Sequence, residues 1–386
     1  MHTLQVGFGR EMAMPDAVMP LGGVGMVDRD YTGVIDPLYI TCVALTDETG
    51  KTILLYTQDF LRSDTYVVSM RQAISDATGV PFDHIMVAST HTHSAPAVYH
   101  TPLEAARAYQ EICKNAAIRA AQTALADRSE ANVFAGQTQT DRLNFVRHYL
   151  LSDGSYGGDN FGDFKNNTIV DHAEPNDPHM QVIRFAREGK QDVVMVNWQA
   201  HPDYNTGIGE TNISADFPGA LRDKLGQDSD TLVAYFTAAS GDQNPKSRIT
   251  EDNHGLETYR DYGEKLAEYA FEHYDELKPV ENTAFRTTTR DVVLTVDHEL
   301  EHLLPQAMEI WDIYKTQGNK KLANEKAYEI GLSSCFHASA ICRRANLGAT
   351  EIRELNALSL GPVGFVTCTF EMASEHAMEL KEMAPF

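Results

Sequence analysis

The sequence has little of what several classes of protein require. Its five cysteines are scattered and odd in number, and no two have the C-x-x-C spacing of a zinc knuckle or a redox centre, so reduced thiols are expected. No apolar run approaches the length that spans a bilayer, and the first residues lack the basic and apolar regions of a signal peptide. A cytoplasmic protein without a membrane anchor is therefore expected, although a leader that had been removed would leave no trace.

Positive charge is also scarce. The 386 residues include 32 Lys and Arg against 55 Asp and Glu, a net charge of −23. Nucleic acids and anionic membrane surfaces reward positive charge, so neither is expected as the main partner. A small-molecule or lipid-like substrate is therefore the expected partner. Nothing in the sequence indicates an oligomeric state.

The order of apolar segments predicts an α/β protein. Strand-like runs at 38–45 and 52–56 precede a helical pattern at 64–78, a strand that leads into His91, and an Ala-rich helix at 103–126. This alternation favours a mixed β-sheet sandwiched by helices. The charged, helical segment at about 299–332 predicts a helical hairpin outside the main sheet. With no linker and no repeat evident, residues 1–386 are expected to form a single domain.

Several apolar strands end on a group that can bind metal or move protons. The stretch VASTHTHSAP carries His91 and His93, and His201, Asp242 and Glu371 follow later strands. Each taken alone has an ordinary explanation, such as a loop histidine or an acid at the start of a helix. Because ligands of open α/β sheets bind beyond the carboxyl ends of the strands, four such ends together predict a site.

The Gly-rich opening, VGFGREMAMPDAVMPLGGVGM, fits neither a dinucleotide-binding nor a Walker motif. Close backbone approach at the edge of a site is the better interpretation. The loop at 154–167 is rich in Gly, Asp and Asn, and either contacts substrate or is an ordinary surface loop.

Five short motifs together resemble the neutral/alkaline (non-lysosomal) ceramidase family. They are VGFGR, STHTHSAP, NWQAHP, SGDQNP and the terminal FEM, in the family's order and over nearly the whole chain. The family consists of zinc-dependent amidases of sphingolipid metabolism, which split the N-acyl bond of ceramide. The resemblance implies a fold like that of the ceramidase catalytic domain, with Zn²⁺ as the cofactor.

Matched position by position, the resemblance assigns roles to five residues. His91 and His201 would bind zinc, and Glu371 would be the carboxylate ligand, with Glu375 as an alternative. His93 would be the acid/base histidine beside the metal. Arg147, in LNFVRHY, matches the arginine that holds the substrate's polar head or its developing oxyanion.

Three departures count against ceramide itself as the substrate. Asn244 occupies the position of the family's nucleophilic serine. The family's tyrosine ligand, which follows the late glutamate, has no counterpart in the 15 residues after Glu371. The additional C-terminal domain of the ceramidases is missing as well.

The hypothesis that fits both the motifs and the departures is a metal-dependent hydrolase of an amide or ester bond. Metal-activated water would attack the carbonyl, His93 would pass the proton to the leaving group, and Arg147 and Asn244 would stabilise the oxyanion. A catalytically silent, metal-containing binding protein is the alternative, but such a protein has no reason to keep both His93 and Arg147. An amidohydrolase barrel ranks third, because the pattern does not supply eight strand–helix units.

Overall fold

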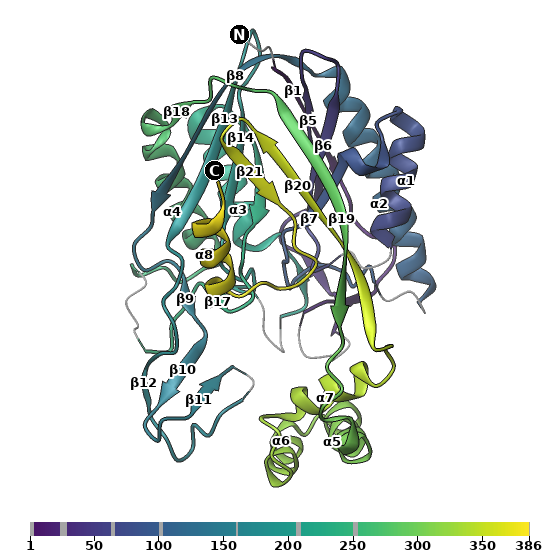
Figure 1. Ribbon diagram of the computed structural model, residues 1–386, viewed down its shortest axis with the longest axis vertical. Coiled ribbons are helices and arrows are strands. Elements are labelled where there is room, and N and C mark those ends of the chain that lie inside the picture. The colour runs from purple at the N-terminus through teal and green to yellow at the C-terminus, as the bar shows by residue number, and fades with distance from the viewer. Residues whose placement is uncertain are drawn as a thin grey trace.

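The computed structural model describes residues 4–23, 29–62, 66–99, 103–159, 161–205, 210–249 and 254–385. Its centre is a mixed sheet with the strand order β16-β14-β13-β8-β1-β5-β6-β7, and β18 (Lys278–Pro279) pairs with β8. The predicted α/β class with a mixed sheet is confirmed (Figure 1). The strands on this path are β1 (Leu4–Met12), β5 (Tyr39–Thr46), β6 (Thr52–Gln58), β7 (Ile85–Ser89), β8 (Ser129–Gln139), β13 (His179–Arg187), β14 (Val193–Trp198) and β16 (Leu232–Thr237).

The sheet consists of two halves that follow the same path. In each half two antiparallel pairs are followed by one parallel pair, which is β6 with β7 in the first half and β14 with β16 in the second. Helices α1 (Tyr66–Thr78) and α3 (Asp216–Ser229) make the two parallel crossovers. The fold therefore contains an internal repeat, whereas none was expected from the sequence.

The two halves pair strand to strand at one end, and their outer strands approach each other at the other end. Strands β1 and β8 pair along just three residues, Leu4 to Val6. At the other end, Thr237 Oγ1 donates a hydrogen bond to the Thr90 carbonyl oxygen at 2.6 Å, which links the segment after β7 to the end of β16. The carboxyl ends of the four parallel strands consequently lie together.

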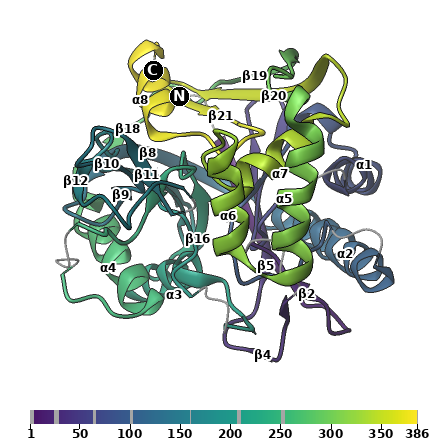
Figure 2. The same ribbon diagram turned by 90° about the horizontal axis from the view of Figure 1, so that it is seen from below.

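Helices cover the outer face of each half. α1 and α2 (Glu104–Ala126) pack on the first half, and α3 and α4 (Tyr259–Glu272) pack on the second, so the helix pairs flank the sheet in Figure 2. Gly7 and Gly9 allow α2 to lie close to β1, since a Cβ there would come within 1.9 Å and 2.1 Å of helix carbonyl oxygens. A third core fills the space between the halves and is closed by strands β19 (Phe285–Thr295), β20 (Thr350–Leu360) and β21 (Val363–Val366).

The helical excursion exists but is larger than expected. α5 (Leu304–Gln317) and α6 (Lys320–Glu329) form the predicted hairpin, and α7 (Cys335–Arg344) adds a third helix. These helices share a separate apolar core, and β19 and β20 carry them away from the main sheet (Figure 1). α7 begins at Ser334, whose side chain accepts a hydrogen bond from the His337 backbone N–H. The single-domain assignment stays a prediction.

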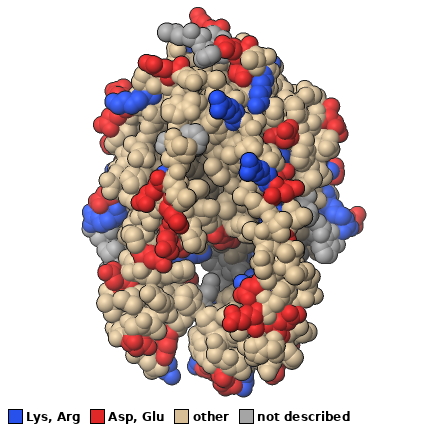
Figure 3. Space-filling model, viewed as in Figure 1, with Lys and Arg blue, Asp and Glu red and all other residues tan. Residues whose placement is uncertain are grey.

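A second protrusion lies at the same end of the molecule. It is a three-stranded sheet of β10 (His148–Leu151), β11 (Tyr156–Gly158) and β12 (Ile169–His172). Figure 3 shows a hollow between this sheet and the helical excursion. Burial raises the pKa of Tyr328 in α6, and the negative charge of Asp163, in the loop after β11, raises it further, as expected for two protrusions that lie near each other. In the described part of the chain, no helix is both long and apolar enough to cross a membrane.

Candidate metal centre

His91 follows β7 in a strained but well-supported conformation. Its φ of 69° lies in the left-handed region, which a non-glycine residue adopts only when its surroundings impose it. Its backbone N–H donates to the Phe60 carbonyl oxygen at 2.9 Å, and its Nδ1 lies 2.8 Å from the Leu61 carbonyl oxygen. Its Nε2 is buried and has no hydrogen-bond partner. Because buried polar atoms are normally hydrogen-bonded, a buried nitrogen without a partner indicates a position where a ligand binds.

His201 follows β14 and is held in the same manner. Its backbone N–H donates to the Gln243 carbonyl oxygen at 2.7 Å, and its Nδ1 lies 3.0 Å from the Ser240 carbonyl oxygen. The residue is almost fully buried. Strand β14 and the loop after β16 thus fix both the position and the orientation of this ring.

His93 is positioned by segments that are far apart in the sequence. Its backbone N–H donates to the Pro202 carbonyl oxygen at 3.0 Å, and its own carbonyl oxygen accepts from Arg29 Nη2 at 2.9 Å. Its ring hydrogen-bonds the backbone of Gly23. A Cβ on Gly23 would lie 2.5 Å from the ring, so only glycine fits. This contact agrees with the interpretation of the Gly-rich opening as close backbone approach.

The three imidazoles face one point. Their ring centroids are 4.6 to 5.2 Å apart, and one nitrogen from each lies within 4.8 Å of the others. A carbonyl oxygen can only accept a hydrogen bond, so Nδ1 of His91 and of His201 carries the proton. The unprotonated Nε2 then offers its lone pair. His93 Nε2 lies 2.8 Å from His201 Nε2, and a cation or a proton between them would relieve the repulsion of two lone pairs.

These distances fit a divalent ion. Two nitrogens bound to one tetrahedral zinc ion lie about 3.3 Å apart, which falls between the 2.8 Å that separates His93 Nε2 from His201 Nε2 and the 4.8 Å within which all three rings offer a nitrogen. His91, His93 and His201 are therefore a group that could hold a metal ion.

The surroundings keep the histidines neutral. Burial lowers the pKa of all three, and for His201 the positive charge of Arg147 lowers it further. For His91 the nearby carboxylate of Glu371 acts in the opposite direction. A neutral imidazole is the form that binds metal, so the site resists competition from protons.

Glu371 lies at the edge of the cluster. Its Oε1 is 3.7 Å from His91 Nε2, and its side chain is 60% exposed. Glu375, the alternative ligand, lies in the first turn of α8 (Ser374–Met383) and is exposed. Of the two carboxylates, Glu371 is the one in contact with a histidine of the cluster.

Arg147 directly follows β9 (Phe145–Val146), and Asn244 lies in β17 (Gln243–Asn244), the short strand that pairs with β9. Arg147 Nη2 donates to the Gly241 carbonyl oxygen at 2.6 Å, and its charge acts on all three histidines. Asn244 Nδ2 donates to Asp159 Oδ2 at 3.2 Å, whereas its Oδ1 is buried without a partner.

Sequence reasoning missed Asp203. Burial raises the pKa of its carboxyl to about 6, and Arg147 opposes that rise. Its position two residues after His201 is the signal that could have drawn attention to it. Asp242 was noticed as a strand-end acid, but both of its carboxylate oxygens are bound by Ser374.

The lowered histidine pKa values predict a pH effect on stability in the metal-free protein. Below about pH 6.5 the unfolded chain takes up protons on these side chains, while the folded chain resists them. Their contribution is therefore complete above that pH and is lost as pH falls. Urea unfolding in a chelator at pH 7.5 and 5.5 should show a larger loss for the wild type than for His201→Ala. Equal losses in the two proteins would contradict the prediction.

The fold and the site together define an α/β protein with a histidine cluster at the strand ends of a duplicated mixed sheet. No protein-family model and no curated protein sequence matches the chain. Among solved structures it is similar to the neutral ceramidase from Pseudomonas aeruginosa, with a TM-score of 0.70 and 14% identity over 99% of this chain and 64% of that one. It is also similar to a ceramidase complexed with C2, with a TM-score of 0.69 and 13% identity over 99% and 66%.

The resemblance predicted from the motifs is thus confirmed at the level of the fold, which is neutral ceramidase-like. The chain spans about two thirds of the length of these ceramidases. The amidohydrolase barrel is excluded, because the central sheet is mixed and largely antiparallel.

Proposed function

We propose that the protein is a zinc-dependent hydrolase of an amide or ester bond. His91 and His201 would hold the ion, and Glu371 would complete the ligand set. The observation that carries the proposal is that one nitrogen from each ring lies within 4.8 Å of the others, with Nδ1 of His91 and of His201 held by a backbone carbonyl group. Two histidines and a carboxylate leave a fourth position open, as in catalytic rather than structural zinc sites.

A bound zinc ion would polarise the substrate carbonyl and make water acidic enough to ionise near neutral pH. Side chains of the protein would stabilise the oxyanion and transfer the proton. Arg147 is held beside the histidines by its bond to Gly241 and would stabilise negative charge on the carbonyl oxygen. The second amide N–H of Asn244 would stabilise the same negative charge. His93, whose Nε2 faces the cluster, would take up the proton that the attacking water loses and deliver it to the leaving group.

An N-acyl, ceramide-like amide is the substrate class that we infer. The support is the similarity in fold to ceramidases over nearly the whole of this chain. Hydrolysis would proceed without a serine nucleophile, because Asn244 has no hydroxyl group to attack with.

A silent, metal-containing binding protein is the second candidate. One observation favours it: the residue at the position of the family serine is fastened to Asp159 rather than free. In that case the hollow between the two protrusions would bind a ligand without turnover.

Metal content tests the proposal first. Purified protein should contain about one zinc ion per chain by elemental analysis, and His91→Ala and His201→Ala should each lose it. His302→Ala, which changes an exposed histidine of the helical excursion, is the matched control. A folded wild-type protein with no stoichiometric metal would refute the hydrolase mechanism. Full metal content with no activity on a panel of N-acyl amides and esters would favour the binding protein.

A further inference from the structure

The loop of residues 240–243, which follows β16, contacts most of the proposed site. The carbonyl oxygens of Ser240 and Gln243 accept hydrogen bonds from the His201 ring and backbone. Those of Gly241 and Asp242 accept from the guanidinium and the backbone N–H of Arg147. The backbone of this loop therefore sets one proposed ligand and the proposed oxyanion group relative to each other.

The side chain of Asp242 binds the C-terminal segment. Its Oδ1 accepts from the Ser374 backbone N–H at 2.8 Å, and its Oδ2 accepts from Ser374 Oγ at 2.9 Å. Both residues are buried, at 3% and 0% exposure. The Asp242 carboxylate thus lies at the N-terminus of α8, where the helix dipole also stabilises negative charge.

The chain just before α8 lies directly on the same loop. Gly241 N–H donates to the Met372 carbonyl oxygen at 2.9 Å. A Cβ on Gly241 would lie only 2.6 Å from the carbonyl oxygen of Glu371, so any larger residue would push the segment away. Glu371 itself is mostly exposed, and among the described residues its side chain contacts His91, at 3.7 Å. Its position must therefore come from its neighbours.

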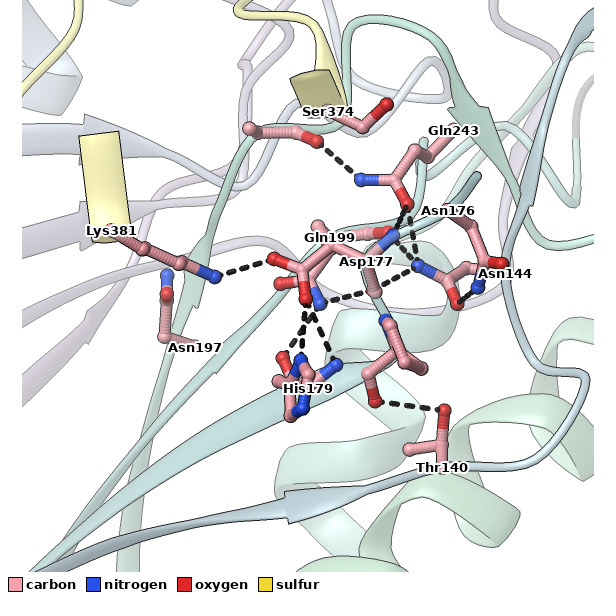
Figure 4. Close-up of polar contacts among 12 residues, drawn as sticks. Thr140, Asn144, Asn176, Asp177, His179, Asn197, Gln199, Gln243, Ser374 and Lys381 are labelled. Carbon is pink, nitrogen blue, oxygen red and sulfur yellow. Dashed lines mark hydrogen bonds and ion pairs between the residues drawn. The ribbon is translucent and has the colours of Figure 1, made fainter. Parts of the chain in front are cut away.

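A second anchor lies further along α8. Lys381 Nζ is 2.6 Å from Asp177 Oδ2, and Figure 4 shows this pair beside a buried polar network. In that network Gln243 Oε1 accepts from Asn144 Nδ2 at 2.7 Å and from the Asp177 backbone N–H at 3.0 Å. Helix α8 is thus held at two points, and the Asp242–Ser374 contact is the one near Glu371.

We propose that Asp242 is a positioning residue, which holds Ser374 and thereby sets the Glu371 carboxylate beside His91. This inference rests on the proposed function, because it takes Glu371 as a metal ligand. Residues that orient ligands in this way typically contribute about 10- to 100-fold to metal affinity. Asp242 thus supports the site without itself binding the ion.

The test compares zinc affinity, measured by competition with a chromophoric chelator, in the full-length protein. Asp242→Asn and Ser374→Ala should each weaken binding by about 10- to 100-fold. In a Glu371→Gln background the same changes should have no further effect, since they act only through that carboxylate. A general loss of stability would instead weaken binding equally in both backgrounds, and that result would overturn the proposal.

Asp47→Asn provides the matched control. Asp47 accepts from both the backbone N–H and the hydroxyl of Thr49, at 2.9 and 2.6 Å, in an exposed turn between β5 and β6. This variant should bind zinc like the wild type.

The outcomes separate the two proposals. A wild-type protein that binds no zinc would refute the proposed function. A wild type that binds zinc, with Glu371→Gln weakened and both Asp242→Asn and Ser374→Ala unchanged, would refute only the positioning role. Unchanged affinity in Glu371→Gln would refute Glu371 as a ligand and the positioning role with it.

Discussion

Replacement of His93 with alanine is expected to lower kcat for amide hydrolysis by about 10²- to 10⁴-fold. An amine leaves as a neutral molecule only after it has gained a proton. His93 Nε2 faces the cluster, 2.8 Å from His201 Nε2, and is the proposed donor. Metal content should remain near one per chain, because His91, His201 and Glu371 are the proposed ligands. Steady-state kinetics and elemental analysis of the same preparations measure both effects.

A substrate with a good leaving group makes this test sharper. A nitrophenyl ester releases an anion that needs no proton, so His93→Ala should hydrolyse it with a much smaller loss. The exposed-histidine variant His302→Ala should match the wild type on both substrates. If His93→Ala loses its metal together with its activity, His93 is a ligand rather than the acid, and full amide hydrolysis by this variant would exclude both roles.

Replacement of Asp59 with alanine should cost about 3–5 kcal/mol of unfolding free energy. Asp59 and Arg222 form a bidentate ion pair, at 2.6 and 2.8 Å, with both residues buried. Burial lowers the pKa of Arg10, and the positive charge of the nearby Arg222 lowers it further. Removal of the carboxylate would leave the buried Arg222 guanidinium without this ion-pair partner and near a second positive charge, that of Arg10. Urea unfolding with linear extrapolation measures the loss.

Two comparisons identify the cause of that loss. The double variant Asp59→Asn/Arg222→Met removes both charges and should recover most of the stability. Asp228→Ala removes the partner of Lys224 from a more exposed pair within α3, and it should cost only about 0.3–0.5 kcal/mol. A cost for Asp59→Ala as small as that of Asp228→Ala would show that the buried pair contributes little.

The candidate site could be predicted from the sequence because its chemistry is local. His91 and His93 follow one apolar strand and His201 follows another, and strand ends of an α/β sheet are where ligands bind. What could not be predicted was the use of individual carboxylates. Asp59, Asp242 and Glu371 all follow strands, yet the first pairs with a buried arginine, the second binds Ser374, and only the third contacts a histidine of the cluster.

The extent of the helical excursion was underestimated for a similar reason. The pattern at 299–332 covered α5 and α6, whereas α7 is a short helix that begins beyond this range, at Cys335. This helix is stabilised by the apolar core that it shares with the other two, which is a tertiary effect.

By itself, the sequence determined the α/β class, the two strands that end in histidine, and the resemblance in motifs to ceramidases. These features depend on periodicity and on residue type over short stretches, which the chain carries directly. Only the tertiary structure decided that the sheet is duplicated, that its outer strands approach each other, and that the three histidine rings meet. The reason is physical: the backbone carbonyl groups of Leu61, Ser240 and Gly23 that orient the rings come from segments that meet only when the chain folds.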